Sequence, residues 1–174
     1  MPSSQKINEG FDNERGEMKQ AVRHSSPKDH YKADVCIVWC FDKRFASLLQ
    51  EFVRVRGFEH FDQISVAGGA KALAAEKGDN ERTFVMGQIE KSIKLHHTAR
   101  IILMTHSDCG AYGGLKAFGT EENERAHHVK ELRRAAKTVT ESFPGIPIER
   151  MFADFEGLHE TLETKPQRRA RIRE

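Results

Sequence analysis

The chain has 174 residues and a mass of 19.8 kDa, the usual size of one domain. Its hydrophobic share of 38% excludes a chain that is disordered throughout. Three cysteines are too few for a secreted disulfide scaffold, so they indicate a metal site or a reducing compartment, which we expect to be the cytoplasm. No apolar run approaches the roughly 18–20 residues of a membrane span, so no membrane partner is expected.

The net charge of +2 is unevenly distributed, and it divides the chain into three parts. Residues 1–31 carry five basic and five acidic side chains and are expected to form an N-terminal arm with a short helix around residues 12–23. Residues 32–164 are expected to form the folded domain. Residues 165–174 form a basic tail that we expect to be solvated, although it could instead contact phosphate or a membrane surface. Because the domain itself is mildly acidic, no nucleic-acid partner is expected.

Short apolar runs alternate with amphipathic segments along the folded domain. The first run, Val35 to Trp39, is continuously apolar, as in a strand that is covered on both faces. Strands are expected at residues 35–39, 61–66, 101–104 and 148–155, and helices at 45–56, 83–96 and 121–142. This alternation predicts an α/β fold, in which a parallel β-sheet core is flanked by helices.

Polar clusters follow three of the expected strands. They begin at Cys40, at Ala67 and at His106. Ligands of a parallel sheet bind beyond the carboxyl ends of its strands, near the point where the strand order reverses. The three clusters are therefore expected to converge at one edge of the sheet.

Cys40, His106 and Cys109 together supply two thiolates and an imidazole, a set that suits Zn²⁺ and leaves a fourth position open. His106 and Cys109 are three residues apart in a turn, so both can reach one ion. The alternative is a capping histidine between two buried thiols. Asp42 and Arg44 follow Cys40 closely, and an arginine beside an aspartate would hold it as a carboxylate. That pair could instead be a surface salt bridge.

Cys-x-Asp-x-Arg at 40–44, followed about 62 residues later by His-x-x-Cys at 106–109, resembles the β-class carbonic anhydrases. The resemblance covers roughly residues 34–158. It includes Ala67-Gly68, which resembles the family's Ala-Gly turn, and Phe155 to Leu158, which resembles its closing strand and turn.

The resemblance implies a zinc lyase that interconverts carbon dioxide and bicarbonate, with Cys40, His106 and Cys109 as metal ligands. Zinc would lower the pKa of its water to about 7, and the resulting hydroxide would attack carbon dioxide. Asp42 and Arg44 match the family's catalytic dyad, whose aspartate can close onto the metal when the pair breaks. The family also implies a homodimer or a higher homo-oligomer, clasped by the N-terminal arm.

The chain departs from the family at the glycine segment. The family's Arg-Asn-Ala-Gly-Asn corresponds to Ser65 to Gly69, which lacks the arginine. The expected substrate-pocket residues are Ala67, Gly68, Gly69 and Gly110, although the first three could form only a tight turn. Two alternatives therefore stay open: a relative that hydrolyses another small substrate, such as carbon disulfide or carbonyl sulfide, and a non-catalytic zinc-binding protein.

The remaining cysteine and the paired histidines have simpler interpretations. Cys36 lies four residues before Cys40, about 13 Å along a strand at roughly 3.3 Å per residue, so it is expected to be a core thiol. His127 and His128 point about 100° apart on a helix and are expected on a solvated face, with proton shuttling as the alternative. His96 and His97 are expected to favour a helix C-terminus through their charge.

Overall fold

The computed structural model describes residues 20–162, which form a five-stranded sheet with the strand order β2-β1-β3-β4-β5. The strands are β1 (Val35–Trp39), β2 (Phe61–Ser65), β3 (Ile101–His106), β4 (Ile148–Ala153) and β5 (Leu158–Glu160). Strands β1 to β4 pair in parallel, and β5 pairs antiparallel to β4. The expected α/β fold with a mostly parallel sheet is confirmed.

The prediction of a single last strand over residues 148–155 is wrong at its end. The carboxylate of Asp154 accepts hydrogen bonds from the backbone N–H groups of Glu156 and Gly157, both at 3.0 Å. The backbone N–H of Asp154 also donates to the carbonyl of Gly157 at 2.9 Å. This tight turn ends β4 at Ala153 and reverses the chain into β5.

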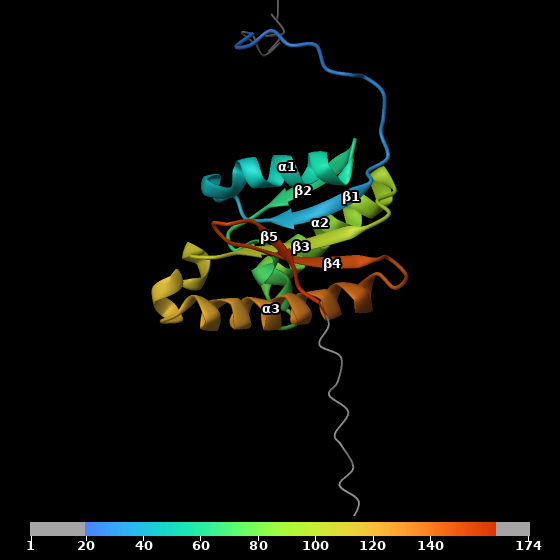
Figure 1. The fold of residues 1–174 in the computed structure, drawn as a ribbon. Coiled ribbons are helices and arrows are strands. Elements are labelled where there is room, and N and C mark those ends of the chain that lie inside the picture. Colours follow the sequence, from blue (N-terminus) through green and yellow to red (C-terminus); the bar gives the residue numbers. More distant parts are fainter. Residues whose placement is uncertain (1–19, 163–174) are drawn as a thin grey trace, which may run out of the picture.

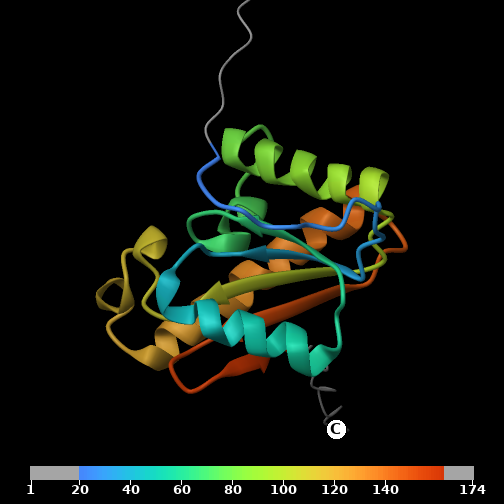
Figure 2. The same ribbon diagram turned by 90° about the horizontal axis from the view of Figure 1, so that it is seen from above.

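Helices cover both faces of the sheet, and Figure 1 shows α1 and α3 on opposite sides of it. The helices are α1 (Ala46–Arg56), α2 (Asn80–His96) and α3 (Glu121–Ser142). Helix α1 covers one face, whereas α2, α3 and the 3-10 segment Gly69–Ala74 cover the other, as Figure 2 shows from above. Helix α2 begins three residues earlier than expected because Asp79 caps it, accepting a hydrogen bond from the backbone N–H of Arg82 at 2.9 Å.

The strands β1 and β3 are buried along their whole length, as their apolar sequences predict. Successive side chains point to opposite faces of a strand. Ile37 and Met104 accordingly pack in the cluster under α1, whereas Val38 and Leu103 pack in the cluster under α2 and α3. The alternation places His106, two residues after Met104, on the α1 face.

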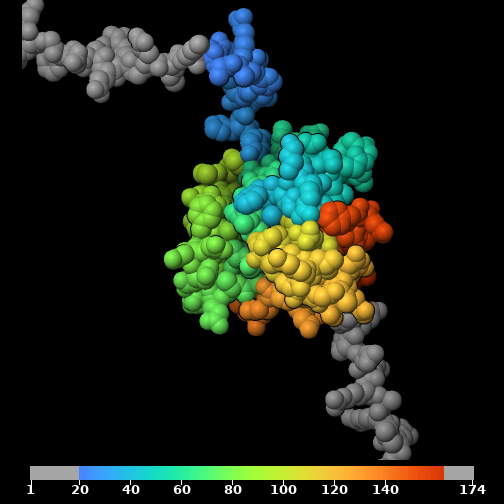
Figure 3. Space-filling model, turned by 90° about the vertical axis from the view of Figure 1, so that its left-hand side faces the viewer, coloured from blue at the N-terminus to red at the C-terminus, as the bar shows by residue number. Residues whose placement is uncertain are grey.

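The sheet has its switch point between β1 and β3. From β1 the chain crosses to β2 on one side, and the strand that follows in sequence, β3, lies on the other side of β1. The carboxyl ends of β1 and β3 therefore open onto the crevice that parallel sheets use for ligands. Figure 3 views the edge where the segment after β1 (cyan), the segment after β3 (yellow) and the chain after β4 (red) adjoin.

The ends of the chain are only partly described. Residues 20–31 contain no helix and are exposed, and the Tyr31 hydroxyl donates to Asp62 Oδ1 at 2.7 Å. The remainder of the helix expected around residues 12–23 and the basic tail 165–174 lie outside the described residues. No helix within residues 20–162 is long and apolar enough to cross a membrane.

Candidate metal centre

Three donor side chains meet at the carboxyl ends of β1 and β3. Cys40 directly follows β1, His106 is the last residue of β3, and Cys109 precedes the 3-10 turn Gly110–Tyr112. One donor atom from each residue lies within 4.8 Å of the other two. All three are almost completely buried, with exposed fractions of 4%, 0% and 2% respectively. The sequence separates Cys40 from the other two by a helix-strand-helix segment, and the parallel pairing of β1 with β3 brings them together.

The imidazole of His106 is oriented as a metal ligand would be. Its Nδ1–H donates to the carbonyl oxygen of Ser107 at 2.8 Å, which leaves Nε2 as the unprotonated nitrogen. Nε2 is buried and has no hydrogen-bond partner within residues 20–162. The ring packs against Phe45, with the ring centroids 4.7 Å apart, and against Trp39 at 6.0 Å. In metal sites, a hydrogen bond from the ring nitrogen that does not bind the metal fixes the tautomer and direction of the ligating histidine.

The two thiols of the cluster are coupled. A hydrogen bond from Cys109 lowers the pKa of Cys40 well below its usual range, although burial opposes the shift. The backbone N–H groups of Asp42 and Gly68 also lower the pKa of Cys40. The pKa of Cys109 is raised in turn by the neighbouring Cys40. The cluster thus already stabilises one thiolate, and a bound metal would deprotonate the second thiol.

The chemistry of these donors fits zinc. Two thiols and one imidazole are a ligand set found at zinc sites with an open position. The orphaned Nε2 of His106 is a buried acceptor that a metal would satisfy. Within residues 20–162 this is also the one group of three such side chains close enough to share an ion.

Asp42 and Arg44 form an ion pair beside the three donors. Arg44 donates to Asp42 Oδ2 from Nη2 at 2.7 Å and from Nε at 3.1 Å, and its backbone N–H donates to Oδ1 at 3.0 Å. The hydrogen bonds from the Arg44 side chain lower the pKa of Asp42 to about 2, although burial opposes the shift. With this lowered pKa the carboxylate of Asp42 is ionised near pH 7. Its Oδ2 lies 3.9 Å from His106 Nε2, which places the negative charge next to the three donors.

Arg44 has a second carboxylate partner that the sequence did not suggest. Its Nη1 donates to Asp108 Oδ2 and its Nη2 to the Asp108 carbonyl, both at 2.9 Å. The guanidinium also lies 5.5 Å from the centre of the Phe155 ring. Asp108 lies two residues after His106 and directly before Cys109, and this position inside the His-x-x-Cys motif was the available signal.

The expected pocket residues occupy different environments. Gly68 is buried and its N–H faces Cys40, whereas Ala67 and Gly110 are exposed. Gly69 has a φ of 58°, and a Cβ there would lie 2.4 Å from the carbonyl oxygen of Met104. Without a side chain at Gly69, the start of the 3-10 segment Gly69–Ala74 can pack directly on the backbone of β3. The close packing and the positive φ are enough to explain why this position is a glycine. A substrate-contacting role for Ala67, Gly68, Gly69 and Gly110 stays a prediction.

The expectation of a solvated histidine pair on α3 is wrong for His128. Its side chain is 0% exposed, because it belongs to a buried stripe that continues through Leu132, Ala135 and Val139. Burial lowers the pKa of His128 to about 3, so the ring is neutral near pH 7 and is not tuned for proton shuttling. His127 is half-buried. His96 is the last residue of α2, at the helix C-terminus as expected, and its Nδ1 also contacts the Asp62 carboxylate at 2.9 Å.

Sequence reasoning also missed Glu124, which is 1% exposed although it lies in the polar first turns of α3. The signal was its spacing, since it stands one helical turn before His128 on the same buried stripe. Its carboxylate accepts hydrogen bonds from the hydroxyl of Ser107 at 2.6 Å and from the backbone N–H of Asp108 at 2.7 Å.

Comparison with known proteins agrees with this architecture. An uncharacterized protein of Rickettsia bellii is 29% identical to this chain, and the match covers 83% of this chain and 93% of that protein. An uncharacterized protein of Rickettsia conorii is 26% identical, and the match covers 85% of this chain and 84% of that protein. Two solved structures share the fold. Carbonic anhydrase from Streptococcus mutans has a TM-score of 0.52 at 19% identity, covering 76% of this chain and 84% of its own. The β-carbonic anhydrase isoform I of Trichomonas vaginalis has a TM-score of 0.55 at 14% identity, covering 82% and 90%.

A family model described as "Putative carbonic anhydrase" matches residues 30–163, which is well over half of the chain. The matched range contains the whole sheet and all three donors. The chain therefore belongs to this β-carbonic-anhydrase-like family.

Proposed function

We propose that the protein binds one zinc ion through Cys40, His106 and Cys109 and interconverts carbon dioxide and bicarbonate. The observation that carries the proposal is the buried Cys-His-Cys cluster beside an ionised aspartate–arginine pair. Membership of the carbonic-anhydrase-like family supports the same reaction.

Each part of the site has a distinct task in this proposal. When bound, zinc supplies a Lewis acid that makes hydroxide available near neutral pH. Asp42 accepts a hydrogen bond from the attacking water and orients it. Because the pKa of Asp42 is lowered to about 2, this carboxylate acts as a fixed acceptor, not as a base that stores the proton near pH 7. Arg44 holds Asp42 in that position.

The direct test is carbon dioxide hydration by protein carrying one zinc per chain, with zinc-free protein as the control. We expect a rate above buffer across pH 7–9 for the loaded protein alone, followed by stopped flow with a pH indicator. A fully loaded protein without any such rate would contradict the enzyme proposal. Turnover of carbon disulfide or carbonyl sulfide by that same sample would then identify another substrate. Inactivity towards all three would leave a non-catalytic zinc protein.

The proposal includes assembly into a homodimer or a higher homo-oligomer. Among the described residues, β2 forms an edge of the sheet. Large apolar side chains are also exposed, including Phe41 at 68% and Phe84 at 58%. Phe84 lines an apolar cavity of about 300 Å³ together with Val66, Ala67 and Val85. Light scattering during gel filtration is expected to give at least twice the 19.8 kDa of one chain. A mass of one chain at micromolar concentration would exclude this assembly.

We also infer a reducing compartment such as the cytoplasm as the site of action. All three cysteines are free thiols, and the proposed ligands Cys40 and Cys109 must stay reduced to bind zinc.

A further inference from the structure

The turn between His106 and Cys109 rests on a buried carboxylate from another element. Glu124, in the first turns of α3, accepts hydrogen bonds from the Ser107 hydroxyl and the Asp108 backbone N–H. These two residues are the whole link between the two donors on this turn. One side chain therefore contacts both residues of the link, at 2.6 and 2.7 Å.

The hydrogen bonds of Ser107 connect Glu124 to His106. The Ser107 carbonyl accepts the Nδ1–H of His106, and the Ser107 backbone N–H donates to the carbonyl of Ala153 at 2.8 Å. The Ser107 hydroxyl, which donates to Glu124, makes the third hydrogen bond that holds Ser107 in place. Fixing Ser107 fixes the direction in which the imidazole presents Nε2.

The hydrogen bonds of Asp108 connect Glu124 to the dyad. Asp108 has a φ of 51°, a left-handed conformation that residues other than glycine adopt uncommonly. Its backbone N–H is held by Glu124 and its Oδ1 by the backbone N–H of Leu115 at 3.0 Å. In this conformation Asp108 presents Oδ2 and its carbonyl to Arg44.

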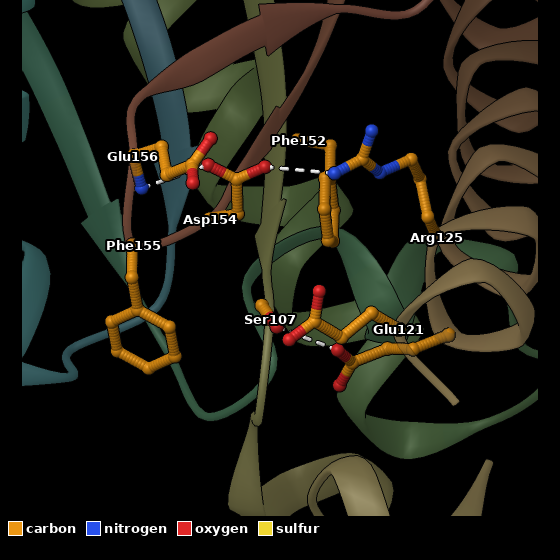
Figure 4. A pocket seen from close by; sticks show the side chains of 8 residues that line it. Ser107, Glu121, Arg125, Phe152, Asp154, Phe155 and Glu156 are labelled. Carbon is orange, nitrogen blue, oxygen red and sulfur yellow. Dashed lines mark hydrogen bonds and ion pairs between the residues drawn. The ribbon is translucent and has the colours of Figure 1, made fainter. Parts of the chain in front are cut away.

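A role in packing does not explain this carboxylate. Burying a carboxyl group is costly unless hydrogen bonds satisfy its oxygens, so packing alone would favour an apolar residue at this position. Glu124 also lines a cavity of about 150 Å³ with Arg125, but Arg125 pairs with Asp154 at 3.0 Å (Figure 4). Within residues 20–162, the hydrogen bonds given to the Glu124 carboxylate all come from the turn.

We propose that Glu124 is a positioning residue that holds the His106–Cys109 turn in its metal-binding geometry and thereby sets zinc affinity. This inference rests on the proposed zinc site but not on the identity of the substrate. Outer partners of metal ligands typically contribute 10- to 100-fold to metal affinity.

The test compares Glu124→Gln with Glu121→Gln, a variant in the same helix and the same cavity whose side chain is exposed. The glutamine amide nitrogen donates but cannot accept, so in Glu124→Gln either the hydrogen bond with the Ser107 hydroxyl must reverse its direction or the contact with the Asp108 N–H is lost. Competition with a chromophoric chelator is expected to show zinc binding weakened 10- to 100-fold in Glu124→Gln. The Glu121→Gln control is expected to bind within twofold of the unmodified protein.

A second measurement separates positioning from general destabilisation. The cobalt-loaded protein should show a changed visible absorption spectrum in Glu124→Gln and an unchanged one in Glu121→Gln, while the melting temperatures of the metal-free forms report on the fold. If Glu124→Gln does not fold, Ser107→Ala removes only the hydroxyl donor and is expected to weaken zinc binding about 10-fold. Unchanged zinc affinity in whichever of these variants folds would overturn the inference. Failure of the unmodified protein to bind zinc would instead overturn the proposed metal site.

Discussion

Replacing Cys109 with alanine is expected to abolish stoichiometric zinc binding. Cys109 is 2% exposed and supplies one of three donors within 4.8 Å of one another. Structural zinc sites are worth about 10–16 kcal/mol, so removing one ligand should cost roughly 3 kcal/mol, or more than about 100-fold in affinity. Metal analysis after dialysis against a weak chelator should find about one zinc per chain in the unmodified protein and close to none in the variant.

Cys36→Ala is the matched control for the loss of a buried cysteine. Cys36 is also fully buried, and burial raises the pKa of its thiol to about 12, as expected of a core residue outside the metal cluster. The control should keep one zinc per chain even if it is somewhat less stable. Zinc retained by Cys109→Ala, or lost from Cys36→Ala while that variant stays folded, would contradict the ligand assignment.

Replacing Asp42 with asparagine is expected to leave zinc bound but to lower kcat/KM for carbon dioxide hydration by about 100-fold. Asparagine removes the charge that Arg44 holds at 2.7 Å, and half of its side-chain amide donates where the carboxylate only accepts. The attacking water would then lose its fixed acceptor. Zinc content and hydration kinetics are measured on the same preparation.

The control for this variant is Glu51→Gln. Glu51 pairs with Arg54 at 2.6 Å, so the control also removes a carboxylate from an arginine pair, but on the exposed face of α1. Its activity should equal that of the unmodified protein. Loss of zinc from Asp42→Asn would show that Asp42 is a structural ligand, and full activity would remove it from the mechanism.

Local sequence pattern predicts the parts of the fold that position the site. The continuous apolar run Val35 to Trp39 is a strand with those bounds, and the helix expected over residues 121–142 has those bounds as well. The meeting of Cys40 with His106 follows from topology, because both stand at carboxyl ends of parallel strands. Nothing beyond the order of strands and helices was needed for that step.

The burial and hydrogen bonds of the polar residues around the site could not be predicted from local sequence pattern. Glu124 and His128 are charged or titratable types that are usually exposed, and only the packing of α3 on the sheet buries them. The short strand β5 depends on the turn made by Asp154, whose hydrogen bonds are invisible to periodicity. Asp108 is fixed by contacts from three separate segments, through Glu124, Leu115 and Arg44.

The position of Cys40 and His106 on neighbouring strands has a consequence for the stability of the whole sheet. The two residues are 66 positions apart in the chain, so an ion bound to both would cross-link the ends of a long chain segment. Such an ion binds the folded state preferentially, and it adds RT ln(1 + [Zn]/Kd) to the free energy of unfolding. The concentration of free zinc would then set the stability of the folded sheet, as well as whether the metal site is complete.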